Sequence, residues 1–144
     1  MKFLQYPAIL EPGDESGIVV TFPDVPEAIT QGDDTADAIE QAEEALGLAL
    51  TTYPERGKRL PAPSPCAPGQ VMIAVEPSMA AKIAVLDAFA AAGVTKTALA
   101  NTLGVSEKEI RMRMDPFHRT KIGPLAATLE ALGKRLVIGI EDAA

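Results

Sequence analysis

Five prolines within residues 54–70 constrain the fold of this chain more than any other feature. Proline has a fixed φ and no backbone N–H, so this segment can continue neither a helix nor the interior of a sheet. We expect an extended segment rather than a flexible one. Residues 71–75 (VMIAV) follow directly and are typical of a strand. We expect this strand to return to a sheet formed by the residues before the prolines.

Short β-prone runs, separated by turn residues, precede the proline segment. The predicted strands are residues 2–10, 18–22 and 28–31. Residues 11–17 (EPGDESG) have the Pro, Gly and Asp typical of a turn, so the first two strands are expected to form a hairpin. After Gly32, Asp34 is placed to cap a helix that ends near Tyr53-Pro54. Its apolar residues recur at helical spacing: Ala38, Ile39, Ala42, Ala45, Leu46, Ala49 and Leu50.

The second half of the chain is predicted to be helical until its last segment. A long helix begins at Pro77 and is closed by Gly93. Three shorter helices are expected at residues 95–103, 106–114 and 121–132. The apolar run 135–141 (RLVIGIE) is a predicted final strand. The expected fold class is therefore α+β, with a β-β-β-α-β unit first. The predicted units are residues 1–76, a connecting helix at 77–93, and residues 94–144.

Charge is divided unevenly between the two halves of this chain, whose net charge is −7. Residues 1–93 hold 5 Lys/Arg and 14 Asp/Glu, whereas residues 94–144 hold 8 and 6. Within residues 96–121 the count is 6 basic to 3 acidic. Such asymmetry indicates two binding tasks, one with a basic protein and one with phosphates. A chance fluctuation on a solvated surface is the alternative.

Several classes of protein are disfavoured by composition. One Cys and one His exclude a disulfide framework and make a metal site implausible. The sequence has no run of about 18 uncharged apolar residues and no signal-peptide pattern, so we expect a cytoplasmic protein without a membrane span. Asp24, Asp33 and Asp34 are candidate ligands of a two-metal nuclease, but Asp33 and Asp34 suit a turn and a helix cap better. We expect no enzyme, no catalytic residue, no metal and no cofactor.

Residues 95–114 predict two short helices joined by a glycine turn. Ala100 is small where two helices must approach closely, and Gly104 can adopt the positive φ of a tight turn. Ser106 is placed to cap the second helix, and Glu109 completes a capping box. This stretch resembles a repressor-type helix-turn-helix, whose second helix enters the major groove of DNA. An ordinary helical hairpin that touches no DNA is the alternative.

The resemblance to that motif implies a set of DNA contacts. Arg111 is a candidate for guanine edges and Lys108 for phosphate. Arg113 falls where the motif normally has an apolar residue, which leaves its register open. The candidate DNA-binding residues are Lys96, Thr97, Ser106, Glu107, Lys108, Arg111, Arg113, Arg119 and Lys121.

Residues 17–46 carry a second pattern: Phe-Pro-Asp-x-Pro after a strand, a Thr-x-Gly-Asp turn, and a helix with spaced Ala and Glu. The matching residues are Phe22, Pro23, Asp24, Pro26, Thr30, Gly32, Asp33, Ala38, Ala42, Glu44, Ala45 and Leu46. In these positions the chain resembles HicB-type antitoxins, and residues 115–136 resemble the helix-turn-helix branch of that family. The resemblance covers nearly the whole chain.

This family resemblance implies a bacterial toxin–antitoxin repressor. The N-terminal domain is expected to have a truncated ribonuclease-H-like fold without catalysis and to bind HicA, a small basic mRNA-cleaving toxin. The C-terminal domain is expected to bind the operator of its own operon. Candidate toxin contacts are Tyr6, Asp24 and Glu27 near the expected sheet edge, and Glu40, Glu43 and Glu44 on the acidic helix face. The three helix residues serve equally well as a solubilising surface.

The final apolar run is too hydrophobic to remain an unpaired strand edge. We expect it to pair with the same strand of a second chain through Leu136, Val137, Ile138 and Ile140. A two-fold dimer would then present two recognition helices about 34 Å apart, which matches a palindromic operator. A higher oligomer stays open.

Two other function classes remain compatible with the sequence. One is a helix-turn-helix regulator whose N-terminal domain binds a small molecule. The other is a protein-interaction module, which would show no salt-sensitive DNA binding. A small basic protein encoded by the neighbouring gene favours the antitoxin.

Overall fold

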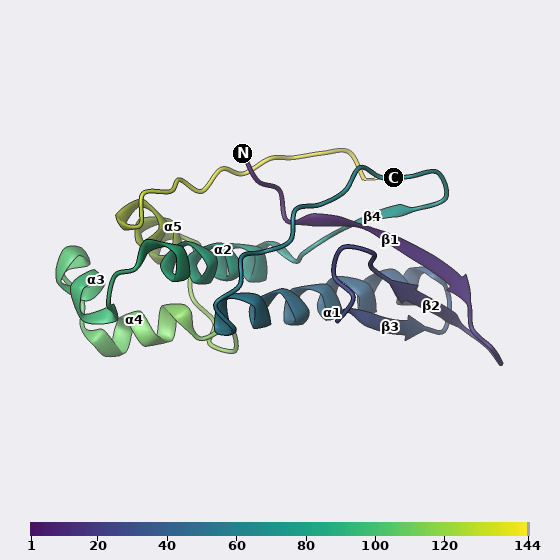
Figure 1. The fold of residues 1–144 in the computed structure, drawn as a ribbon, viewed down its shortest axis with the longest axis horizontal. Helices are drawn as coiled ribbons and strands as arrows, with labels where there is room; N and C mark the ends of the chain where they lie inside the picture. Colours follow the sequence, from purple (N-terminus) through teal and green to yellow (C-terminus); the bar gives the residue numbers. More distant parts are fainter. Residues whose placement is uncertain (144) are drawn as a thin grey trace.

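A small sheet and a group of short helices form opposite ends of an elongated molecule (Figure 1). The structure is a computed structural model that describes residues 1–143. Its four strands are β1 (Gln5–Pro12), β2 (Ile18–Thr21), β3 (Ile29–Gly32) and β4 (Val71–Ala74). They form one antiparallel sheet in the order β3-β2-β1-β4. The predicted β-β-β-α-β order is confirmed, including the return of the strand after the prolines to the first sheet.

Helix α1 (Thr35–Glu55) packs against this sheet, mainly on β3. The predicted cap is present, because the Asp34 carboxylate accepts a hydrogen bond from the backbone N–H of Asp37 at 2.8 Å. Asp37 reaches back and accepts from the N–H of Asp33 at 2.8 Å. Gly32 permits the close approach of strand and helix, since a Cβ there would lie 2.3 Å from the backbone nitrogen of Ala38. Strand, turn and helix are therefore fixed by adjacent residues.

The proline segment is held against the sheet unit rather than hanging free. The hydroxyl of Tyr6 donates to the carbonyl of Pro61 at 2.7 Å. Asp24 accepts from both the backbone N–H and the hydroxyl of Ser64, at 2.8 and 2.6 Å. Residues 58–67 contain neither helix nor strand. This agrees with the expectation that the prolines exclude regular structure from the segment.

Four helices follow the sheet unit: α2 (Pro77–Ala92), α3 (Lys96–Leu103), α4 (Glu107–Met114) and α5 (Ile122–Ala131). Their apolar side chains form a second cluster, separate from the one between α1 and the sheet. Helix α2 belongs to both, because Ile83 packs in the first cluster while Ala81, Val85 and Ala88 pack in the second. It is the element that connects the two cores (Figure 1).

The predicted helix ends are largely confirmed. Gly93 and Gly104 end α2 and α3 with φ of 69° and 66°. The hydroxyl of Ser106 accepts from the N–H of Glu109 at 3.0 Å. The other half of the predicted capping box is wrong, because the Glu109 carboxylate accepts a hydrogen bond from Arg113 instead.

The predicted strand at residues 135–141 is not formed within residues 1–143. Leu136 packs partly against the second cluster, whereas Ile138 and Ile140 are 73% and 99% exposed. A strand requires a neighbour for its backbone hydrogen bonds, and no strand of the described chain pairs with this segment. Within the same residues, no single helix is long and apolar enough to cross a membrane. Helices α2 and α3 meet that test only as a pair bent by 114°.

Candidate functional site

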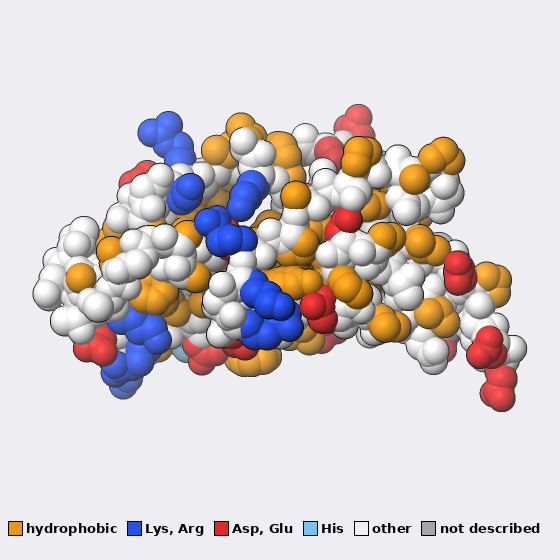
Figure 2. Space-filling model, viewed as in Figure 1, with side chains coloured by type: hydrophobic (Ala, Val, Ile, Leu, Met, Phe, Trp, Pro, Cys, Tyr) orange, Lys and Arg blue, Asp and Glu red, His pale blue; other side chains and the backbone are white. Residues whose placement is uncertain are grey.

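The first candidate surface is acidic and belongs to the sheet unit. Residues 3–55 contain 12 Asp/Glu and no Lys, Arg or His. Asp14 and Glu15 are exposed in the turn between β1 and β2, and Glu40 and Glu44 on the outer face of α1. Figure 2 shows red side chains on this hairpin at the far right, and blue side chains over α4 at the lower left. On this face, cationic side chains also lie in the middle of the molecule, whereas the hairpin end carries only acidic ones.

Of the cations elsewhere in the first 93 residues, Arg56 neutralises one carboxylate of this surface, and most of the others are bonded away from it. Lys2 and Arg59 both contact the carboxylate of Asp87, which is 6% exposed, at 3.5 and 3.1 Å. Arg56 pairs with Glu27 at 3.3 Å, and Lys82 is buried. Among the described residues of this half, Lys58 is the one cation that forms neither an ion pair nor a side-chain hydrogen bond.

Two of the predicted toxin contacts have internal roles. Tyr6 is 1% exposed, and its hydroxyl is already bonded to the proline segment. Burial raises the pKa of this hydroxyl to about 12, with a smaller contribution from the nearby Asp24 carboxylate. The prediction that Tyr6 presents a surface contact is wrong, because its side chain fills the core. Asp24 is half-buried and fastens the proline segment through Ser64.

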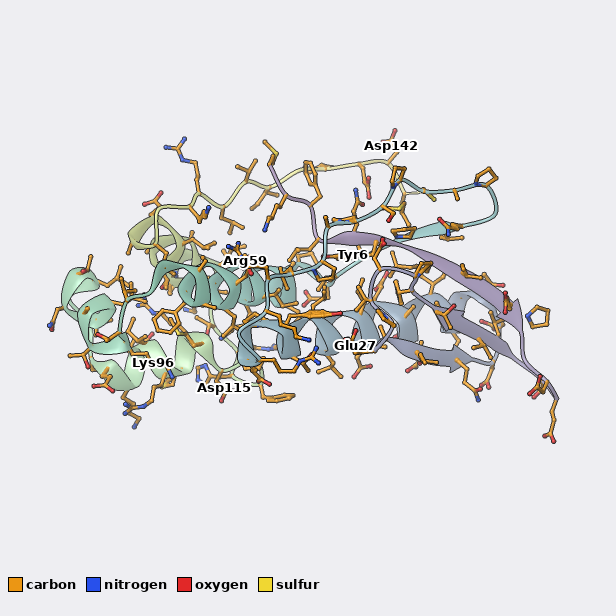
Figure 3. All side chains as sticks on the ribbon, in the orientation of Figure 1. Tyr6, Glu27, Arg59, Lys96, Asp115 and Asp142 are labelled. Carbon is orange, nitrogen blue, oxygen red and sulfur yellow. The ribbon has the colours of Figure 1, made fainter. Side chains whose placement is uncertain are left out.

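Glu27 is exposed but is fixed in place beside α1 (Figure 3). The hydroxyl of Tyr53 donates to it at 2.6 Å, and Arg56 donates at 3.3 Å. These donors lower the pKa of the Glu27 carboxyl, the tyrosine bond being the larger cause. Burial and the Glu27 carboxylate together raise the pKa of Tyr53 to about 12. Glu43 is half-buried on α1, between the exposed Glu40 and Glu44.

The second candidate surface is formed by α3, α4 and the residues after them. Leu99 and Ile110, 3% and 0% exposed, belong to the apolar cluster that holds the two helices together. The exposed side of α4 presents Glu107, Lys108 and Arg111. Glu107 accepts from Thr97 at 3.2 Å and from Arg111 at 2.9 Å, so it orients the guanidinium of Arg111. Four further predicted contacts are exposed: Lys96, Ser106, Arg119 and Lys121.

Arg113 is the member of the predicted DNA-binding set that the structure removes. It is 8% exposed, and its guanidinium donates to Glu109 at 3.1 Å and to the Thr128 hydroxyl at 3.1 Å. A longer bond of 3.4 Å reaches the carbonyl of Pro124. Arg113 therefore joins α4 to α5, at the position where an apolar residue is usual, and its prediction as a DNA contact is wrong.

Sequence reasoning missed two buried charges on α2. The ammonium of Lys82, a residue 3% exposed, donates to the carbonyl of Met112 at 3.1 Å and to the Thr120 hydroxyl at 2.7 Å. Burial lowers its pKa. Asp87 receives a two-pronged contact from Arg59 at 3.1 Å for each oxygen. The available signal was that Lys82 and Asp87 are the only charged residues of an otherwise apolar helix.

Comparisons with known proteins show the family to which this chain belongs. Residues 5–84 match the model of a family described as "HicB_like antitoxin of bacterial toxin-antitoxin system". The chain belongs to this HicB-like antitoxin family, which confirms the resemblance inferred from the sequence. No group of three or more His, Cys, Asp or Glu side chains in residues 1–143 is arranged to hold a metal ion.

Curated relatives extend the similarity over nearly the whole chain. "Antitoxin HicB 1" of Photorhabdus laumondii is 40% identical over 141 residues, which cover 98% of this chain and 90% of the relative. "Antitoxin HicB" of Escherichia coli K12 is 38% identical over 133 residues, which cover 92% and 96%. "Antitoxin HicB" of Pseudomonas fluorescens is 28% identical over 136 residues, or 93% of each chain. The similarity thus includes α3, α4 and α5 as well as the sheet unit.

Proposed function

We propose that this chain neutralises a small basic mRNA-cleaving toxin of the HicA type and represses its own operon by binding operator DNA. The observation that carries the proposal is the uneven distribution of charge: residues 3–55 contain acidic side chains and no cation, whereas residues 96–121, which include α4, have a basic excess. Family membership supports the antitoxin part. The proposed setting is the bacterial cytoplasm.

The domain organisation follows the two apolar cores. We take residues 1–76 as the toxin-binding domain, of the truncated ribonuclease-H-like type, and residues 94–144 as the DNA-binding domain. Residues 77–93 connect them, which agrees with the contribution of α2 to both cores. No catalytic role is assigned to any residue of this chain.

Toxin binding is proposed to use the outer face of α1. Glu40, Glu43 and Glu44 lie there, and Glu27 and Asp24 lie on the loop between β2 and β3. Opposite charge steers two proteins together and raises the association rate, with a smaller effect on the dissociation rate. The carboxyl of Glu27 is held ionised by Tyr53 and Arg56, and its pairing with Arg56 leaves Glu40 and Glu44 as the exposed carboxylates that steer a basic partner.

A charge-neutralised variant tests this surface. The double variant Glu40→Gln/Glu44→Gln is expected to associate more slowly with the basic product of the neighbouring gene, and to show a weaker salt dependence of association. Glu130→Gln, on the exposed side of α5, is the matched control and is expected to bind like the unmodified chain. Equal association rates for all three proteins would contradict the proposed surface.

DNA binding is proposed to use α3, the glycine turn and α4 as a helix-turn-helix. In this arrangement Arg111 faces base edges, while Lys96, Lys108, Arg119 and Lys121 face phosphates. Thr97, Ser106 and Glu107 then position α4, the helix that would enter the major groove. The exposed side chains of Val137, Ile138 and Ile140 support pairing of two copies through the tail, with the half-buried Leu136 as the fourth proposed contact.

Operator binding is testable with the full chain and the DNA upstream of its gene. Affinity is expected to fall steeply with salt, because each neutralised phosphate releases counterions. Lys108→Ala is expected to lower both the affinity and the salt slope, whereas Lys58→Ala on the sheet unit changes neither. A chain that binds no DNA, at low salt as well, would refute this half of the proposal.

A further inference from the structure

A pocket of about 440 Å³ lies between the start of α2 and residues 116–120 of the loop that joins α4 to α5. Lys82 forms part of its wall from α2, and His118, Arg119 and Thr120 form part of it from the loop. The pocket therefore brings cationic and hydroxyl-bearing side chains together from elements 30 or more residues apart. Figure 3 locates this region by Asp115, where α4 ends.

Lys82 is the buried charge of this pocket. An ammonium has three N–H donors, and Met112 and Thr120 accept two of them. Among residues 1–143, no third acceptor lies within hydrogen-bond distance of this ammonium, and Lys82 lines the pocket. Lys82 forms no direct ion pair among residues 1–143, and its burial lowers the pKa of the amine, while the more distant charges of Asp115 and Glu109 oppose that shift. An anion in the pocket would stabilise the charged form.

Glu76 is the one carboxylate among the described residues that line the pocket, and both of its oxygens already accept hydrogen bonds. The two oxygens of Glu76 accept from the backbone N–H groups of Ser78 and Met79, each at 3.0 Å, and so cap the start of α2. This interaction with the positive end of the helix dipole reduces the repulsion that Glu76 exerts on an anion. Arg119 is exposed, and His118 lies 3.3 Å from the hydroxyl of Thr120 through Nδ1.

We propose that this pocket binds a phosphate group. Lys82 supplies a buried charge, Arg119 supplies a bidentate donor from the loop, and Thr120 and His118 supply further hydrogen bonds. Two sources present the same chemistry: a backbone phosphate of DNA docked on α4, or a free nucleotide. Phe117, 82% exposed at the rim, offers a surface on which the base of a nucleotide can stack.

The test uses the full chain and inorganic phosphate, with no DNA and no toxin. His118 is the only histidine, so its ring signals in NMR spectra report on the pocket without ambiguity. At fixed pH and ionic strength, phosphate is expected to shift these signals saturably, whereas chloride is not. Arg119→Gln is expected to weaken phosphate binding several-fold, and Lys134→Gln, an exposed control in the C-terminal segment, is expected to leave it unchanged. Lys82→Met should abolish binding if circular dichroism shows that it folds.

The results separate the two sources of phosphate. If adenosine monophosphate binds more tightly than phosphate and Phe117→Ala removes the difference, the ligand is a free nucleotide. If the nucleotide gains nothing and Arg119→Gln instead weakens operator binding with a smaller salt slope, the ligand is the DNA backbone. Phosphate binding persists if the chain proves to bind no operator, so the two proposals fail independently. The proposal would be overturned if the ring signals of His118 shifted with ionic strength alone. It would also be overturned if phosphate caused the same shift in Arg119→Gln as in the unmodified chain.

Discussion

Arg111 and Arg113 lie two residues apart on α4 and are expected to respond to truncation in opposite ways. The side chain of Arg111 is 54% exposed and pairs with Glu107, whereas that of Arg113 is 10% exposed and bonds Glu109, Thr128 and Pro124. An exposed i,i+4 ion pair contributes about 0.3–0.5 kcal/mol. Hydrogen bonds of a buried guanidinium contribute more, about 1.5–3 kcal/mol each for a charged group, and are not additive.

We therefore expect Arg113→Ala to lower the free energy of unfolding by about 2–4 kcal/mol, and Arg111→Ala to change it by less than about 0.5 kcal/mol. For a chain of this length the first change corresponds to a fall in Tm of roughly 6–12 °C. Urea denaturation followed by circular dichroism measures both values. Arg113→Met should lose less than Arg113→Ala, because methionine fills the space and buries no charge.

Operator binding provides the second readout of the same pair. Arg111→Ala is expected to lose affinity at unchanged stability, and Arg113→Met is expected to bind like the unmodified chain once both are folded. The reasoning is refuted if Arg113→Ala is as stable as the unmodified chain. It is refuted equally if Arg113→Met folds fully but no longer binds, since a buried guanidinium cannot contact DNA.

Three further predictions concern other contacts. The lowered pKa of Glu27 means that its bonds stabilise the fold fully above the ordinary pKa of 4.5 and are lost as the pH falls through the lowered value. Glu27→Gln should thus be less stable than the unmodified chain at pH 7 in urea titrations, and equal to it at strongly acidic pH. A difference that persists in acid contradicts this linkage. Arg59→Ala should cost about 1–3 kcal/mol, because Asp87 is left buried with Lys2 alone, and Arg59→Ala should cost far less in an Asp87→Ala background. Additive losses in that double-mutant cycle would argue against the pairing. Deleting the residues after Gly133 should give a monomer by sedimentation with little operator binding, and a deleted chain that remains a dimer and binds normally refutes the pairing of tails.

Local signals explain why much of the fold could be predicted from the sequence. The cap at Asp34, the glycine turn at Gly104 and the prolines of residues 54–70 act on neighbouring residues, so each can be recognised in a short window. Helix α1 has 21 residues, enough turns for its apolar period to define the buried face. The glycine turn also allowed the position of the turn between α3 and α4 to be predicted.

The errors arise where structure depends on residues distant in the chain. Helix α4 has only 8 residues, so its short period could not decide whether Arg113 faces solvent or α5. Arg59 and Asp87 are 28 residues apart, and Tyr6 and Pro61 are 55 apart, so no window contains either pair. The apolar tail was predicted wrongly for another reason. A strand at residues 135–141 requires a neighbouring strand, and the described single chain does not provide one.

The central claim is that this chain neutralises a toxin, and a titration of RNA cleavage tests it most directly. The small basic product of the neighbouring gene is mixed with a fixed mRNA substrate and increasing amounts of this chain, and the rate of cleavage is measured. We expect cleavage to stop near stoichiometric amounts, and Glu40→Gln/Glu44→Gln to require more protein than Glu130→Gln at physiological salt. Cleavage that continues at a large excess of this chain, with no complex on gel filtration, would contradict the claim.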